Sequence, residues 1–500
     1  MKSILKIFIL PLALLTACVD SLDDYNIDQK QASTVTAEPL FSSALKSFSD
    51  IMTTPNVNSN NFRLYAQQWT TTQYLDEPRY VLNVRLIPQN FWNALYRDVL
   101  SDLNEARRIL DEDQLMAPAT KNPRLAQIGI MEAYTWLILV NTFGDIPYSE
   151  ALDPDTPLPK YDDAQTIYLD VMTRLDESIA LMTGPGFVGG DFLYKGDQNG
   201  WVRFGNSVKL KMAMVLADNP ETAALAETVV IEAVGSLEEG ETTLILENSQ
   251  NARFPYMPSA PNNNPISANL NLTLQSRRDF VGSNTLIDVM NSLNDPRRPY
   301  FFDPKAGTTE FIGGYYGYTN NPVEDYSEVS AKVKALDFEA LLLDASEIHF
   351  LLAEAMERGI IEGGSAEAEN HYNLGITRSI EYWTEGGSAA TYLSQPQVAY
   401  TTAEGDWRQK IGTQKWIALY NRGWDAWVEW RRLDYPRLVP PSDATAPKPA
   451  NQDRPAAELF IPVRMIYPIN EQTLNPGNRG AAASAIGGDM ATTKLFWDVY

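Results

Sequence analysis

The stretch FWNALYRDVLSDLNEARRIL, residues 91–110, decides the fold class of this chain. Its apolar side chains recur every three or four positions, which is the spacing of a helix that buries one face. The stripe consists of Phe91, Leu95, Val99, Leu103, Ala106 and Leu110, widened by Trp92, Tyr96 and Ile109. A helix with such a face has to pack against other elements, so the stretch predicts a packed helical scaffold.

The rest of the chain repeats this helical pattern outside one central region. Residues 125–143 are apolar on most sides, which predicts a central helix ended by Gly144-Asp-Ile-Pro147. Further helices are predicted at residues 40–52, 61–69, 164–182, 202–216, 220–234, 284–294, 345–358, 365–383 and 407–433. Between residues 240 and 335 Asn, Pro, Gly, Tyr and Phe dominate, which indicates long loops and short strands. The fold class is therefore mainly α, with helix pairs in a tetratricopeptide-like arrangement and a loop-rich part that carries short strands.

The first residues have the features of a secretory signal. Lys2 and Lys6 give a basic start, and the apolar run that follows is too short for a permanent membrane span. Small residues then precede Cys18, the only cysteine, as at the cleavage and lipidation site of a bacterial lipoprotein. A plain signal peptide with an incidental cysteine is the alternative. Lipidation of Cys18 would hold the protein to a membrane without a transmembrane helix.

Composition excludes several classes of function. The formal net charge is −24, so binding to nucleic acid or to an anionic membrane surface is disfavoured. With one cysteine and two histidines, His349 and His371, the chain has no set of ligands for a Cys/His zinc site. We expect both histidines to be packing or surface residues and assign no metal ligands. A structural calcium ion on the acidic surface is compatible with the composition but unassigned, and a carboxylate pair for glycoside hydrolysis stays open.

Two aromatic-rich stretches are the candidate ligand site. Sugars present C–H faces that stack on aromatic rings and hydroxyls that pair with polar side chains. The predicted ligand-binding residues are Trp69, Gln73, Tyr74, Asp76, Arg79 and Tyr80 in the first stretch, and Tyr315, Tyr316 and Tyr318 in the second. The alternative for each aromatic residue is ordinary burial.

Five motifs, in this order behind the cysteine, resemble those of the SusD/RagB family of nutrient-binding outer-membrane lipoproteins, in particular its second SusD-like subgroup. They lie at residues 90–100, 134–147, 346–355, 414–432 and 466–475. The resemblance implies four tetratricopeptide-like helix pairs, no catalysis, and a SusC-like TonB-dependent transporter as partner, over which the lipoprotein sits as a hinged lid. Ligand residues vary within the family, so none is transferred by motif.

The resulting prediction is a signal peptide at residues 1–17, a lipidated flexible leash at 18–38 and one SusD-like domain at 39–500. Within that domain we expect residues 39–239 and 336–435 to form the helical scaffold, and 240–335 and 436–500 the loop-rich part. The protein would be anchored in the outer membrane facing the cell exterior, because the acidic residues after Cys18 resemble the surface-export signal of Bacteroidota lipoproteins. It would capture oligosaccharides for import. Peptide capture is the nearest alternative; a surface glycoside hydrolase and an adhesin are more distant ones.

Overall fold

The computed structural model describes residues 35–235, 237, 242–270, 278–319, 321–452 and 454–500. The predicted signal peptide, Cys18 and most of the predicted leash therefore lie outside the described residues. Helix α2 (Ala37–Thr53) begins inside the range predicted for the leash, so the last two leash residues are helical. The structured domain thus starts slightly earlier than expected.

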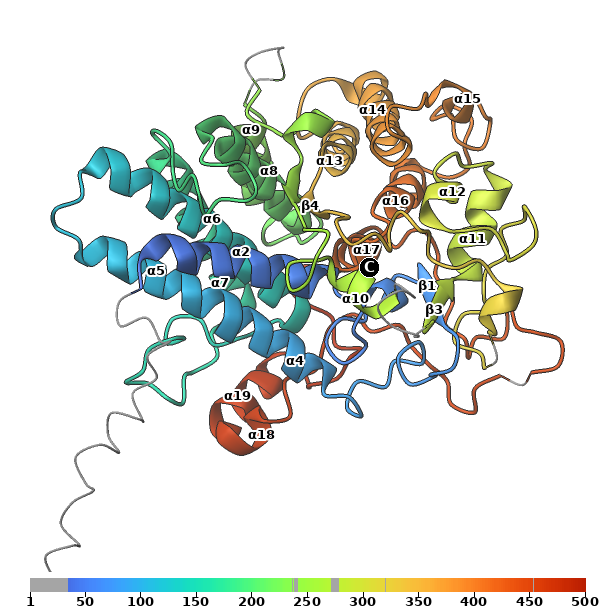
Figure 1. The fold of residues 1–500 in the computed structure, drawn as a ribbon, viewed down its shortest axis with the longest axis horizontal. Helices are drawn as coiled ribbons and strands as arrows, with labels where there is room; N and C mark the ends of the chain where they lie inside the picture. Colours follow the sequence, from blue (N-terminus) through green and yellow to red (C-terminus); the bar gives the residue numbers. More distant parts are fainter. Residues whose placement is uncertain (1–34, 236, 238–241, 271–277, 320, 453) are drawn as a thin grey trace, which may run out of the picture.

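Long helices form the scaffold, which confirms the mainly α prediction (Figure 1). After α2 they are α4 (Ile87–Asn93), the π-helix η1 (Ala94–Leu100), α5 (Ser101–Glu112), α6 (Pro118–Phe143), α7 (Ala164–Leu181), α8 (Gln198–Leu216), α9 (Ala223–Val234), α13 (Ala345–Glu357), α14 (Gly364–Thr384), α16 (Trp407–Ala418) and α17 (Gly423–Leu433). They pack in pairs, α2 with α5, α6 with α7, α8 with α9 and α13 with α14.

Shorter elements make up the remainder. They are α3 (Phe62–Tyr65), α10 (Pro265–Leu270), α11 (Asn284–Ser292), α12 (Arg298–Phe301), α15 (Ala390–Leu393), α18 (Glu471–Leu474), α19 (Pro476–Ala485), and the 3-10 helices η2 (Asn248–Gln250) and η3 (Val323–Asp325). Strand β1 (Trp69–Thr71) pairs antiparallel with β3 (Phe280–Gly282), and β2 (Ala252–Phe254) with β4 (Ala340–Leu343). The tail, residues 436–500, is mostly loop as predicted but also contains α18 and α19.

The stripe of residues 91–110 is buried as predicted, but the helix that carries it is not uniform. Phe91, Leu95, Val99 and Leu103 are all 0% exposed. They are spaced four residues apart, and in an α-helix each such step advances about 40° beyond a full turn. The wider π turns of η1 reduce this drift. The spacing of four between successive buried residues was therefore the feature of the sequence that indicated the π-helix.

Helix α6 is the central helix that its composition predicted. From Ala126 to Phe143 every residue is buried. The helix starts earlier than residue 125, because Pro118 occupies its first position, where a missing N–H costs nothing. Pro123 then lies inside the helix and removes one backbone hydrogen bond without ending it.

Two other predicted helices are interrupted, and tertiary contacts explain both breaks. In residues 61–69 the helix stops at Tyr65, Gln67 adopts a left-handed φ of 52°, and Trp69 enters β1. In residues 407–433 a break separates α16 from α17. There Asn421 has a φ of 68°, and Gly423 lies so close to Arg63 that a Cβ would meet its backbone nitrogen at 2.4 Å. Each break lets distant segments approach.

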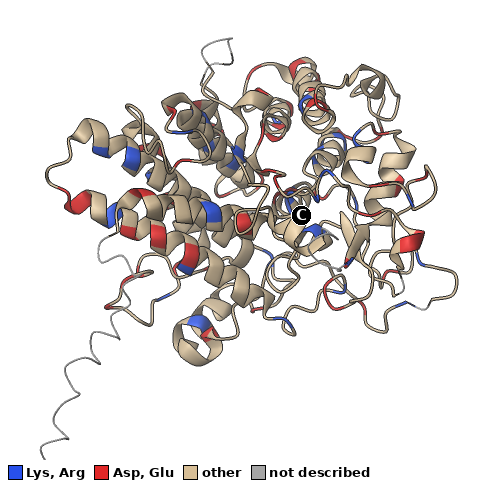
Figure 2. Ribbon diagram, in the orientation of Figure 1, with Lys and Arg blue, Asp and Glu red and all other residues tan. Residues whose placement is uncertain are grey.

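A network of buried charges runs through the scaffold; Figure 2 shows residues of both signs along its inner helices. We call it the charged network. Its six cations and six anions balance, and each lies within 4 Å of a partner of opposite sign. The members are Lys211, Arg358, Arg408, Lys415, Arg422 and Arg432 with Asp218, Asp344, Glu347, Glu354, Asp425 and Glu429. Although burial opposes ionisation, Arg432 and Arg358 lower the pKa of Glu354 to about 2.

Candidate ligand-binding site

The two aromatic-rich stretches, more than 200 residues apart in sequence, lie against each other. The Arg79 guanidinium Nε donates a hydrogen bond to the Gly317 carbonyl at 2.8 Å. The rings of Tyr80 and Tyr316 have centroids 6.4 Å apart. Both stretches therefore contribute to one region of the surface, beside β1 and β3.

The loop at residues 313–319 has its shape because glycine allows a close approach. A Cβ on Gly313 would meet the Asn284 Cα at 2.3 Å, and Gly317 has a φ of 72°, which favours glycine. The buried Asn321 amide holds the loop closed. Its Nδ2 donates to the carbonyls of Thr71, Tyr315 and Tyr318 at 3.0–3.2 Å.

Three of the predicted ligand residues are core residues. Trp69, Tyr316 and Tyr318 are 1%, 4% and 1% exposed. Trp69 Nε1 donates to the Tyr420 hydroxyl at 3.0 Å, and the Tyr316 and Tyr318 hydroxyls donate to the carbonyls of Leu64 and Pro441 at 2.6 and 2.7 Å. Their polar tips are satisfied internally. The rings of Trp69 and Tyr318 offer no open stacking face, and the small exposed part of Tyr316 borders the cleft described below. The alternative of ordinary burial holds for these three residues.

The other six predicted residues reach the surface. Tyr74 is 38% exposed, with the Arg85 guanidinium 5.2 Å from its ring centroid. Gln73 is exposed, while Asp76, Arg79, Tyr80 and Tyr315 are half-buried. Partial burial lowers the pKa of Arg79, which stays far above neutral pH and keeps its charge. These side chains combine aromatic faces with donors and acceptors, as a sugar ligand requires.

A cleft of about 230 Å³ opens beside Tyr316, and we call it the loop cleft. None of the six residues above belongs to its lining, but the Tyr80 hydroxyl lies 3.5 Å from Nε2 of Gln67, which does. One wall is Tyr316, another is the start of α11, and the segment 437–447 closes it. Its lining residues are Gln67, Asn284, Thr285, Asp288, Tyr316, Arg437, Val439, Pro441, Ala446 and Pro447. Gln67 is fixed there, because its amide donates to the Val439 carbonyl at 3.0 Å and accepts from the Thr285 hydroxyl at 2.9 Å.

Asp288 and Arg437 are polar groups of this cleft that the sequence analysis missed. Burial raises the pKa of Asp288, which has no ion-pair partner among the described residues. The Arg437 side chain is 69% exposed. The available signal was helical spacing: Thr285 and Asp288 lie three apart on the face of α11 opposite the buried Leu286 and Met290.

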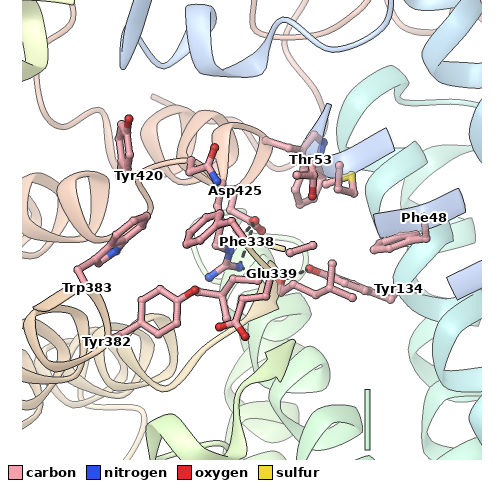
Figure 3. A pocket seen from close by; sticks show the side chains of 16 residues that line it. Phe48, Thr53, Tyr134, Phe338, Glu339, Tyr382, Trp383, Tyr420 and Asp425 are labelled. Carbon is pink, nitrogen blue, oxygen red and sulfur yellow. Dashed lines mark hydrogen bonds and ion pairs between the residues drawn. The ribbon is translucent and has the colours of Figure 1, made fainter. Parts of the chain in front are cut away.

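The pocket in Figure 3 is too small for an oligosaccharide. It has a volume of about 30 Å³, enough for one or two water molecules. Phe48 and Tyr134 come from one apolar cluster of the core, and Trp383 and Tyr420 from the other. The cavity therefore marks an imperfect junction between the two halves of the core.

Comparison with known proteins identifies the family. A family model described as "Starch-binding associating with outer membrane" matches residues 29–468. The chain belongs to the SusD-like family. This confirms the resemblance drawn from the five motifs. Among curated proteins the sequence has no match.

Solved structures of other SusD-like proteins have the same fold. A chitin-binding SusD homologue from Flavobacterium johnsoniae is 23% identical with a TM-score of 0.75, over 92% of this chain and 99% of that one. A SusD-like protein from Bacteroides thetaiotaomicron is 21% identical with a TM-score of 0.74, over 93% and 99%. A SusD homologue from Bacteroides uniformis is 23% identical with a TM-score of 0.71, over 92% and 99%.

The two histidines of this SusD-like chain are structural residues. His349 and His371 are buried and hydrogen-bonded to each other through their Nδ1 atoms at 2.9 Å, so they pack α13 against α14. In the described part of the chain, no three His, Cys, Asp or Glu side chains gather in a metal-binding arrangement. Calcium binding stays untested. No helix there combines the length and apolarity that crossing a bilayer requires.

Proposed function

We propose that this SusD-like protein captures oligosaccharides at the cell surface and delivers them to a SusC-like TonB-dependent transporter. Family membership supports a carbohydrate-binding role at the outer membrane. The features of this chain that support the proposal are the loop cleft and, near it, two aromatic-rich loops that contact each other and expose part of their side chains. Lipidation at Cys18 would anchor the protein and leave this domain facing outward.

The loop cleft suits a neutral or acetamido-bearing sugar. Its lining offers the Asp288 carboxylate, the Arg437 guanidinium and neutral amides as hydrogen-bonding groups. Tyr74, Asp76, Arg79 and Tyr80 add aromatic and polar surface in the first aromatic-rich stretch, outside that lining. An N-acetyl group adds an N–H donor for a carboxylate and a carbonyl acceptor for a guanidinium. Because two neighbouring structures are described as chitin-binding proteins, chito-oligosaccharides are the first ligands to test.

The proposal describes a binding protein rather than an enzyme, as the relatives are. Calorimetric titration with chito-oligosaccharides, malto-oligosaccharides and short peptides, followed by chromatography of the products, separates the alternatives. Binding of a sugar without turnover supports the proposal. Preferential binding of peptides supports peptide capture, and released sugar products support a glycoside hydrolase.

Association with the transporter is tested separately. Purification of the lipidated protein from its own outer membrane in mild detergent should recover a TonB-dependent barrel, and extracellular protease should digest the protein on intact cells. Recovery without a barrel, or full protection from protease, contradicts the transporter and surface parts of the proposal.

A further inference from the structure

A second and larger cleft lies at the other end of α11. We call it the amide cleft; its volume is about 470 Å³, within the range of ligand-binding clefts. It lies between α11, α14, α16 and the segment 394–406. Its lining residues are Val289, Ser292, Leu293, Tyr372, Pro396, Gln397, Thr402, Ala403, Glu404, Gln409, Lys410, Thr413 and Gln414. No residue of the sequence-based prediction lies in it.

The amide cleft is rich in neutral hydrogen-bonding groups. The side chains of Gln397, Gln409 and Thr413 make no hydrogen bonds to other described residues, so their donors and acceptors are available to a ligand. Formal charges are few and opposite in sign, namely Lys410 and Glu404. Neutral amides and hydroxyls of this kind match the hydroxyl and acetamido groups of a neutral sugar.

The side-chain amide of Gln414, a hydrogen-bond donor in this cleft, is fixed by a chain of hydrogen bonds on its buried side. Gln414 is 3% exposed, and its Oε1 accepts a hydrogen bond from the Tyr392 hydroxyl at 3.1 Å. Tyr392 in turn accepts from Arg297 at 3.5 Å, and Arg297 is fixed by Asp295 through a bond of 2.9 Å from its Nε. The Gln414 Nε2 has no partner among the described residues. This donor is therefore available to a ligand carbonyl or hydroxyl.

Helix α11 forms a wall of both clefts. Asn284, Thr285 and Asp288 line the loop cleft, and Val289 and Ser292 line the amide cleft. Thr285, Asp288 and Ser292 are spaced three and four residues apart, so they share one face of the helix. The rise of an α-helix places Thr285 and Ser292 about 10 Å apart along it. The linings continue past these positions, to Asn284 in the loop cleft and to Leu293 in the amide cleft, so a ligand that fills both clefts has to be longer than this distance.

We propose that the amide cleft is a second subsite for the same oligosaccharide, and that long chains contact both clefts along the outer face of α11. This inference rests on the proposed function and adds a preference for long chains over short ones. A second contact made by one ligand acts at high effective concentration, so affinity rises with chain length without any change in the first contact.

The test is calorimetric titration of the whole soluble domain with paired short and long probes. The probes are the disaccharide and the hexasaccharide of N-acetylglucosamine, and maltose with maltohexaose. We define the length gain as the affinity for the hexasaccharide divided by that for the disaccharide of the same series. We expect a length gain of about tenfold or more in the series that binds.

Substitutions in each cleft show which cleft produces the length gain. Gln414→Glu keeps the oxygen that accepts from Tyr392 but replaces the amide donor. Gln409→Ala removes a half-buried amide at little risk to folding. Each substitution should lower the length gain severalfold. Gln114→Glu makes the same chemical change at an exposed position and should leave it unaltered. Asp288→Asn, in the loop cleft, should lower the affinity for the short and the long probe of a series by the same factor.

The outcomes separate this inference from the proposed function. Sugar binding with no length gain, or a length gain that both amide-cleft variants retain, overturns the second subsite and leaves the proposed function standing. If neither series binds, both fail together. A length gain lost in folded Gln414→Glu and Gln409→Ala protein, as judged by circular dichroism, supports the inference.

Discussion

The charged network and the aromatic loops around α11 both bury polar atoms, but by different means. In the network, ionised side chains from α8, α13, α16 and α17 pair with one another. In the loops, single polar tips of aromatic residues bond to backbone carbonyls, as Tyr316 does with Leu64. The first arrangement fixes the relative positions of helices. The second shapes loops while leaving other side chains of the same stretches exposed to a ligand.

Removing one charge from the charged network should have the largest effect on the free energy of unfolding. Arg432→Met leaves Glu354 and Glu429 without their shared partner in a fully buried site. We expect the free energy of unfolding to fall by about 3–5 kcal/mol, measured by chemical denaturation. In contrast, Arg108→Met breaks ion pairs whose arginine is 51% exposed, and should change the free energy of unfolding far less. Equal effects of the two substitutions would show that the network is no more important than a surface pair.

The histidine pair gives the scaffold a dependence on pH. His349 Nε2 donates to the Leu246 carbonyl at 3.1 Å, so its Nδ1 accepts from His371. Burial, together with His371 and the nearby Arg378, lowers the pKa of His349 to about 3. Burial also lowers the pKa of His371, because its effect is larger than the opposite effect of the Glu367 charge. The unfolded chain therefore binds more protons below pH 6.5, and stability should fall as pH drops from about 6.5 towards 3.

The slope for His349 is at most about 1.4 kcal/mol per pH unit. Denaturation curves recorded between these pH values should show a shallower loss of stability in His349→Gln, which cannot take up the proton. The carboxylates of the network, with lowered pKa values such as that of Glu354, contribute in both proteins and cancel in the comparison. Parallel curves for the two proteins would exclude the histidine pair as a source of the pH dependence.

In the loops, loss of one backbone contact should have an intermediate effect. Tyr316→Phe leaves the buried Leu64 carbonyl without this donor, and we expect a loss of about 1–3 kcal/mol in the free energy of unfolding. Tyr74→Phe is the matched control, because the Tyr74 hydroxyl makes no hydrogen bond to another described residue. If both substitutions are neutral, the buried tyrosine does not hold the loop.

The smallest effect on stability should come from the exposed aromatic residue. Tyr74→Ala removes a ring that is 38% exposed, so the unfolding free energy should change by less than about 1 kcal/mol. If the ring stacks on the sugar, affinity should drop by a few-fold to about tenfold, the range of one aromatic contact. Calorimetry with the sugar that binds best measures this. Unaltered affinity would remove Tyr74 from the site.

The fold was largely predictable from sequence, because helical spacing is a local signal. The stripe of residues 91–110 and the all-round apolar α6 are buried as their patterns indicate. The site was predictable only in part. Whether Trp69 or Tyr74 faces solvent depends on segments far away in sequence, since β1 pairs with β3 and Tyr316 reaches back to Leu64. Composition marks two aromatic-rich loops that contact each other, but burial of each ring is decided by those long-range contacts.

One consequence concerns how ligand preference could be altered. The two clefts share α11, whose own buried face consists of Leu286, Ile287 and Met290, each 0% exposed. A change of volume beneath the helix would tilt or shift it as a unit, since close-packed interiors transmit such strain. Both clefts would then widen or narrow together. Selection for a different sugar could thus act through substitutions that never touch the ligand, and laboratory evolution should sample these three positions alongside the cleft walls.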